Sequence, residues 1–322
     1  MRLLFIFLDG VGLGQDDPAV NPFARVPMPN LAALLGGHKL ISDGKLSIDP
    51  SDSFLVNTDR ATLLALDACL GVDGIPQSAT GQASLITGIN ISARLGFHEG
   101  PKPTPAIVDL ISQGTIFTQL HGRGKSASLL NAFPPRYFES IGTGYRLPGV
   151  IAFSVNHAGF PLKNSSDLFK GDAISTDFTA EGWQTHLGYQ DTPLLSHVQA
   201  GQRLHELAAQ FDLSIFEYWL TDIAGHHRDM PAACSLLETL DTVFGSLLSE
   251  WDYSNGLIIL TSDHGNLEDL STRRHTRNDV PLLVIGTPEL RTSFIHQLDL
   301  ASATRPKLDL TDIAPAILHF IG

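Results

Sequence analysis

Short unbroken apolar runs alternate with amphipathic segments along this chain. Four runs have the length of a strand and no polar–apolar alternation; they span residues 3–8, 213–220, 256–261 and 281–286. Runs of this kind are typical of strands that are covered on both faces, as in a largely parallel sheet. Helical periodicity marks the segments at about 81–94, 104–113, 195–211 and 231–250. This alternation predicts an α/β layer fold.

The segment from about 137 to 190 departs from the pattern. It is rich in Gly, Ser, Asp and aromatic residues, and its periodicity is weak. We interpret it as a small irregular insertion or cap in a single domain that spans residues 1–322. Just before it, the sequence SASLLNAF (126–133) predicts one more strand of the core.

Composition narrows the class of protein. The chain has 322 residues, of which 43% are hydrophobic, enough for one large α/β domain. Its net charge is −13 and it has no Lys/Arg-rich run, so we expect no nucleic-acid partner. The two cysteines, at 69 and 234, do not indicate a disulfide framework, and they do not have zinc-finger spacing.

No apolar stretch is long enough to span a membrane, and the N-terminal run lacks a signal-peptide cleavage pattern. We therefore expect no membrane partner and, by default, a cytoplasmic location. The oligomeric state is left open.

Aspartate and histidine residues gather where the apolar runs end. Chemistry in α/β folds collects at the carboxyl ends of the strands, so these side chains are predicted to meet. They are Asp9 after the first run, Asp222 and His226 after the second, Asp263 and His264 after the third, and His275 eleven residues later. An isolated Asp here could simply cap a helix. Together, the carboxylates and imidazoles form a donor set that suits two divalent ions, Zn²⁺ or Mn²⁺.

The sequence GIPQSATGQASLITGIN (74–90) leads into a predicted helix. Ser78 or Thr80 lies at its beginning, where backbone N–H groups favour an anion such as phosphate. Ser78 could be an ordinary N-cap. A hydroxyl beside two metal ions would instead be an activated nucleophile.

The opening glycines allow a different class of protein, a dinucleotide-binding oxidoreductase. Gly10, Gly12 and Gly14 are spaced G-x-G-x-G rather than G-x-G-x-x-G, and residues 26–34 lack the acid that would bind the ribose. We therefore interpret the glycines as a tight turn that leaves room around Asp9. A third class, a non-catalytic metal-binding scaffold, would be expected to lack some of these ligands or the nucleophile.

Taken together, these motifs resemble the alkaline phosphatase superfamily, in particular its metalloenzyme branch with cofactor-independent phosphoglycerate mutase and phosphopentomutase. The resemblance is dense over about 1–95 and 210–322. It rests on the sequences TSDHGN (261–266), HTRNDVPLLVIG (275–286), DIAGHH (222–227) and LTDIAPAILHFIG (310–322). It implies a three-layer αβα sandwich with a mostly parallel central sheet and a small inserted cap.

The resemblance also implies roles for the site residues. One metal would be held by Asp222, His226 and His275. The other would be held by Asp9, Asp263 and His264, with the nucleophile hydroxyl directed toward it. Ser78 is favoured over Thr80 as nucleophile, because both the mutase motif and the sulfatase spacing back from Gly88 select it.

Departures from the family motifs refine the expected activity. Gln77 and Gln82 replace the mutase Asn and His, and Thr80 and Gln82 replace the Pro and Arg of sulfatases. The resemblance therefore implies a two-metal phosphoester hydrolase or phosphotransferase that acts through a phosphoserine on a small phosphorylated metabolite. A mutase is the alternative, followed by a sulfuric ester or phosphodiester hydrolase. Arg123, Lys125 and Arg136 are weak candidates for substrate binding.

Overall fold

A computed structural model of the chain describes residues 1–42, 55–144, 147–302 and 307–322. The strands in these ranges are β1 (Arg2–Leu8), β2 (Val56–Asn57), β3 (Ala61–Leu66), β4 (Ala127–Leu129), β5 (Ala132–Phe133), β6 (Lys163–Asn164), β7 (Leu213–Tyr218), β8 (Gly256–Thr261) and β9 (Val280–Ile285). The helices of the first half are α1 (Pro22–Arg25), α2 (Pro29–Leu34), α3 (Ser78–Thr87), α4 (Ile91–Leu95), α5 (Pro105–Ser112), α6 (Ile116–Gly122) and α7 (Pro135–Gly142). Those of the second half are α8 (Val150–His157), α9 (Ser165–Lys170), α10 (Glu181–Thr185), α11 (His197–Ala208), α12 (Leu220–His227), α13 (Met230–Glu250), α14 (Pro288–Ser302), the 3-10 turn η1 (Leu310–Asp312) and α15 (Ile313–Ile321).

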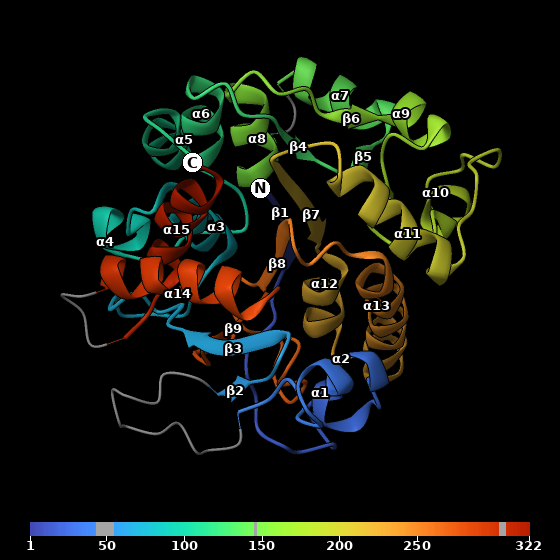
Figure 1. Cartoon of the computed structure of the whole chain (residues 1–322). Coiled ribbons are helices and arrows are strands. Elements are labelled where there is room, and N and C mark those ends of the chain that lie inside the picture. The colour runs from blue at the N-terminus through green and yellow to red at the C-terminus, as the bar shows by residue number, and fades with distance from the viewer. Residues whose placement is uncertain (43–54, 145–146, 303–306) are drawn as a thin grey trace.

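The central sheet has the strand order β2-β3-β9-β8-β1-β7-β4 (Figure 1). Strands β8, β1, β7 and β4 are parallel neighbours, with Leu3 of β1 paired to Leu257 on one side and Leu213 on the other. Strand β9 is antiparallel to both of its neighbours, β8 and β3, and β2 is antiparallel to β3. The prediction of a mostly parallel sheet is thus confirmed for its centre. The predicted strand at 281–286 forms β9, which is antiparallel to its neighbours.

Helices cover both faces of the sheet, which confirms the three-layer α/β prediction. One face packs against α3, α5, α6, α8, α14 and α15, and the other against α2, α11 and α13. Along β1 the side chains alternate between these two cores: Phe5 and Phe7 face the first, and Ile6 and Leu8 the second. This double burial explains why the strand sequences lack polar positions.

The predicted helix at 81–94 is divided in two. Helix α3 ends at Gly88, which has φ +73° and a backbone N–H that donates to the Ser84 carbonyl. A left-handed residue of this kind stops a helix, and glycine adopts it without steric cost. Helix α4 then starts at Ile91.

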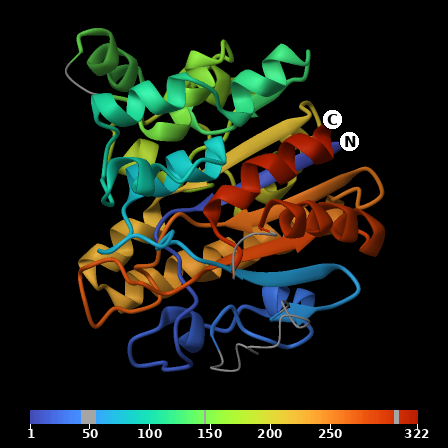
Figure 2. The same cartoon turned by 90° about the vertical axis from the view of Figure 1, so that its left-hand side faces the viewer.

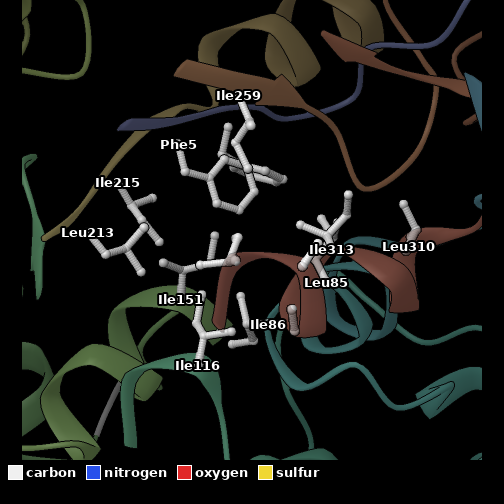
Figure 3. Close-up of a cluster of buried hydrophobic side chains, with 14 of the residues drawn as sticks. Phe5, Leu85, Ile86, Ile116, Ile151, Leu213, Ile215, Ile259, Leu310 and Ile313 are labelled. Atoms are coloured by element: carbon white, nitrogen blue, oxygen red, sulfur yellow. The ribbon is translucent and has the colours of Figure 1, made fainter. Parts of the chain in front are cut away.

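The segment 137–190 is more regular than we predicted. It forms α8, α9 and α10, and α7 overlaps its start (Figure 1). Helix α8 belongs to the main core, where Ile151 lies beside Ile116, Ile215 and Phe5 (Figure 3). Only the part around α9 and α10 has its own small apolar cluster, centred on Trp183. The predicted core strand at 126–133 is confirmed for its first part, β4, whereas β5 pairs with β6 in a separate two-stranded sheet.

The two edges of the sheet differ in what they contain. Strands β1, β7 and β8 begin at the edge where both chain termini lie (Figure 2). Their carboxyl ends, followed by Asp9, Trp219 and Ser262, lie at the opposite edge. In the described ranges, no helix combines the length and apolar character that a membrane span requires.

Candidate metal centre

Six predicted ligands form two compact groups at the carboxyl edge. One group is Asp222, His226 and His275, and the other is Asp9, Asp263 and His264; within each, one donor atom per residue lies within 4.8 Å of the others. Five of the six follow the ends of β1, β7 and β8. His275 instead precedes β9, and it reaches this edge because β9 is antiparallel to β8.

The first group is built around α12. Asp222 and His226 are about one turn apart on this helix and so lie side by side, with Nε2 of His226 3.2 Å from Oδ2 of Asp222. Nε2 of His275 lies 3.7 Å from Oδ1 of Asp222 and 3.2 Å from Nε2 of His226. Asn266 holds the carboxylate in place, because its Nδ2 donates to Oδ1 of Asp222 at 2.7 Å.

The second group lies deeper. Asp263 and His264 are fully buried, and Nε2 of His264 is 3.5 Å from both Oδ1 of Asp9 and Oδ2 of Asp263. The His264 ring stacks on the His275 ring with centroids 3.7 Å apart. The two groups therefore form one continuous cluster.

Backbone carbonyls orient two of the histidines. Nδ1 of His275 lies 2.8 Å from the Pro76 carbonyl, and Nδ1 of His226 lies 2.8 Å from the Arg273 carbonyl. When Nδ1 donates in this way, Nε2 keeps its lone pair, and here both Nε2 atoms point into the first group. A hydrogen-bonded Nδ1 and a free Nε2 are the usual arrangement of a histidine metal ligand.

Glu268, which we did not predict, organises the loops around the cluster. It is buried, and its Oε2 accepts from the backbone N–H groups of Gly12 (2.9 Å) and Asn266 (2.8 Å). Its Oε1 accepts from Thr276 and from Asn278 at 3.0 Å. One carboxylate thus ties the opening glycine turn to the loops on either side of His275.

This arrangement explains the opening glycines. A Cβ at Gly12 would lie 2.3 Å from Oε1 of Glu268, and one at Gly10 would lie 2.6 Å from Oδ1 of Asp222. Gly10 also has φ +67°, which favours glycine. Gly10 and Gly12 therefore leave space for the carboxylates of Asp222 and Glu268.

Replacing Gly12 by alanine is expected to destabilise the protein by about 1–3 kcal/mol, because the new methyl overlaps the buried Glu268 carboxylate, which is held by its hydrogen bonds. Urea unfolding measures this change. The matched control is Gly122→Ala, since a Cβ there meets nothing within 4 Å; we expect it to alter the free energy of unfolding by no more than about 0.5 kcal/mol. Equal effects of the two substitutions would contradict the proposed role of Glu268.

The cluster contains several carboxylates. Among the described residues, no Lys or Arg side chain forms an ion pair with them. Burial raises the pKa of Asp263 to about 7, with a further contribution from the charge of Asp222. Burial and the charge of Asp263 also raise the pKa of Asp9 well above its usual value. Glu217, at the end of β7, has its pKa raised to about 7 by burial and by Asp263. Burial lowers the pKa of His264 to about 3, so its ring is neutral.

These raised pKa values predict that metal binding displaces protons from carboxyl groups. Near pH 6.5 the metal-free protein is expected to keep part of a proton on Asp263, and a bound cation favours the ionised form. Metal affinity should therefore increase as the pH rises from about 6 to 8. Infrared difference spectroscopy should show a protonated-carboxyl C=O band that disappears when metal is added at pH 6.5. An unchanged carboxyl spectrum would contradict this picture.

The two candidate nucleophiles lie in different surroundings. Ser78 is the first residue of α3 and its Oγ is 2.9 Å from Nε2 of His264. The helix approaches closely because Gly81 contacts the Asp263 backbone, and Gln82 donates to Oδ2 of Asp263 at 3.1 Å. Thr80 is fully buried and its hydroxyl lies 3.2 Å from the Gln77 carbonyl, outside the cluster. The N-cap position belongs to Gln77, so Ser78 is not the cap.

The basic residues that we proposed for substrate binding do not join the cluster. Nη1 of Arg123 donates to the Leu318 carbonyl at 2.9 Å, and Lys125 precedes β4, at the edge where the strands begin. Arg136 is exposed on α7. This corrects the expectation for Arg123 and Lys125. Three exposed arginines, Arg273, Arg274 and Arg277, instead flank His275 at the carboxyl edge.

The donor set fits two divalent cations. Oδ1 of Asp9 is buried and has no hydrogen-bond partner, which is costly for a carboxylate oxygen unless a cation satisfies it. Three aspartates and three imidazoles converge without a thiolate, a combination found with Zn²⁺ and Mn²⁺.

Comparison with known sequences relates the second half of the chain to a family. The sequence model of the Metalloenzyme superfamily matches residues 168–322. The 2,3-bisphosphoglycerate-independent phosphoglycerate mutase of Dinoroseobacter shibae is 32% identical over 122 residues, 36% of this chain and 22% of that enzyme. The enzyme of the same name from Methylobacillus flagellatus is 30% identical over 144 residues, 42% of this chain and 26% of that enzyme. The matched region thus spans about a quarter of these relatives.

Comparison with solved structures covers nearly the whole chain. A protein from Pyrococcus horikoshii has a TM-score of 0.56 and 14% identity, covering 99% of this chain and 96% of that one. The alkaline phosphatase of the Antarctic bacterium TAB5 has a TM-score of 0.50 and 13% identity, covering 99% and 98%. At this level of identity the likeness concerns the fold. The chain thus has an alkaline-phosphatase-like α/β fold, and its residues 168–322 match the sequence model of the Metalloenzyme superfamily.

Proposed function

We propose that this protein is a two-metal phosphoester hydrolase or phosphotransferase that acts on a small phosphorylated metabolite through a phosphoserine. The observation that supports this most strongly is the Ser78 hydroxyl, 2.9 Å from His264, at the start of a helix that contacts Asp263 through Gly81 and Gln82. Asp222, His226 and His275 would hold one ion, and Asp9, Asp263 and His264 the other. Zinc or manganese bound there would neutralise the phosphoryl oxygens and lower the pKa of the serine hydroxyl.

Residues of the chain itself would present the nucleophile and attract the anionic substrate. The first residue of α3 presents Oγ of Ser78, and the positive end of this helix favours an anionic phosphoryl group. In the proposed reaction, Oγ forms a bond to phosphorus as the bond to the leaving oxygen breaks, and the alcohol departs with a proton. Water then cleaves the phosphoserine and releases phosphate. Exposed Arg273, Arg274 and Arg277 would attract the anionic substrate to this edge.

The phosphoserine can transfer its phosphoryl group either back to a product hydroxyl or to water. The matched relatives are phosphoglycerate mutases, which favours a mutase reaction. In such a reaction the phosphoryl group returns to another hydroxyl of a retained product. We favour hydrolysis, because the small cap and the absence of buried cationic residues from the described cluster offer little to retain an anionic product.

The test is to assay purified protein, loaded with zinc or manganese, with an aryl phosphate monoester and separately with 3-phosphoglycerate. We expect metal-dependent release of phosphate from the aryl ester and slower or no phosphoryl shift in phosphoglycerate. Efficient isomerisation of phosphoglycerate without phosphate release would replace hydrolase by mutase. Absence of turnover with any phosphoester would contradict the proposal.

A further inference from the structure

A buried arginine lies at the other edge of the sheet. Arg291, in the first turn of α14, is 4% exposed. Its Nη2 donates to the carbonyls of Thr58 (2.7 Å) and Asp59 (3.1 Å), and its Nη1 donates to Oδ1 of Asn57 (2.9 Å) and to Thr62. All four acceptors are uncharged oxygens.

The positive charge of Arg291 is therefore not balanced. No carboxylate in the described ranges forms an ion pair with it, and its Nε is buried without a hydrogen-bond partner. The nearest acidic groups, Asp59 and Glu289, are exposed, and burial lowers the pKa of Arg291 despite their charges. A buried, unpaired charge is costly, and a bound anion is one means of compensating it.

Arg291 lines a cavity of about 370 Å³ between α14 and the β2–β3 hairpin. The described lining residues are Asn57, Thr62, Pro288, Arg291, Thr292, Ile295 and His296. None of these is acidic. Because Oδ1 of Asn57 accepts from Arg291 and Thr62, its Nδ2 is left to donate, as are the hydroxyl of Thr292 and the ring of His296. The lining thus offers donors and positive charge.

This cavity is separate from the candidate metal centre. Strand β9 ends at Ile285, opposite the first residue of β3, at the edge where β1 and β8 begin. Helix α14 starts there, with its positive end toward the cavity. The metal ligands lie at the opposite edge.

We propose that this cavity binds a tetrahedral oxyanion, a phosphate or sulfate group that is either free or part of a small metabolite. The donors of Asn57, Thr292 and His296 form the site, and the buried guanidinium of Arg291 in its lining supplies the positive charge. It is independent of the proposed phosphoester chemistry, so failure of either proposal leaves the other in place.

The test measures the thermal unfolding temperature of the full, metal-loaded chain with inorganic phosphate, sulfate or acetate at constant ionic strength. Thr292→Glu places a carboxylate at the cavity, whereas Ser293→Glu adds the same charge at the next, exposed position outside the lining. We expect Thr292→Glu to be more stable than Ser293→Glu without added anion. Wild type and Ser293→Glu should gain about 3–8 °C at hundredfold excess of phosphate over its Kd, and Thr292→Glu should gain less.

Anion binding at the metal centre is the same in all three proteins, so their difference reports on the cavity. If Thr292→Glu does not fold, His296→Glu provides the same test from the other side of the cavity. Equal phosphate-dependent shifts in wild type, Thr292→Glu and His296→Glu would overturn the proposal. A sugar phosphate that half-saturates the shift at lower concentration than inorganic phosphate would identify a metabolite as the ligand; the reverse order would identify the free ion.

Discussion

Replacement of Ser78 by alanine is expected to reduce kcat for an aryl phosphate by at least about 10³-fold, because it removes the hydroxyl that we propose to form the covalent intermediate. The substitution removes one oxygen, 2.9 Å from His264, from a residue that is already buried. The protein should therefore fold and retain both metal ions. Steady-state kinetics and metal analysis on the same preparation measure the two quantities.

The control for this prediction is Thr80→Val, which removes the other candidate hydroxyl while keeping the shape of the side chain. Thr80 bonds to backbone carbonyls of Gln77 and Glu99 rather than to the cluster. We expect Thr80→Val to alter stability more than kcat. A variant Ser78→Ala with full metal-dependent activity would eliminate Ser78 as the nucleophile.

Removal of divalent metal is expected to have the second large effect. The cluster brings together three aspartates, and Oδ1 of Asp9 has no donor. Chelation should therefore abolish activity and lower the unfolding temperature by about 5–15 °C, the shift expected when an ion present at a thousandfold excess over its Kd is lost. Readdition of zinc or manganese should restore both.

A ligand substitution separates this effect from non-specific chelator damage. His275→Ala removes a donor that lies within hydrogen-bonding distance of both Pro76 and His226, and it should bind fewer than two metal ions per chain. His38→Ala, which changes an exposed histidine outside the cluster, should bind metal as wild type does. Normal metal content in His275→Ala would refute the ligand assignment.

The sequence predicted the layers of the fold and the positions of the strand ends because both depend on local patterns. An unbroken apolar run such as 3–8 is recognisable without knowing its neighbours, and Asp9 at its end is then placed at the carboxyl edge. The i, i+4 spacing of Asp222 and His226 likewise places both side chains on the same face of a helix. The direction of β9 could not be predicted, since an apolar run has no polarity, yet this direction is what brings His275 to the cluster.

Features that depend on distant partners were missed. Glu268 binds Gly12 and Thr276, and nothing near it in the sequence indicates either contact. Arg123 and Lys125 are basic and close in sequence to a strand, but they precede β4 and so lie at the wrong edge. The weak periodicity of 137–190 placed residues 150–157 in the predicted insertion. The structure explains this weak periodicity for α8, because most of its residues are buried and it has no polar stripe.

The central claim is that a phosphoryl group passes through Ser78. The most direct measurement is to mix metal-loaded protein with an aryl phosphate, quench with acid within the first turnovers, and locate the modification by peptide mass spectrometry. We predict a single added phosphoryl group on the peptide that contains Ser78, and none in Ser78→Ala. Turnover with no phosphorylated peptide, or with the phosphoryl group on another residue, would contradict the account.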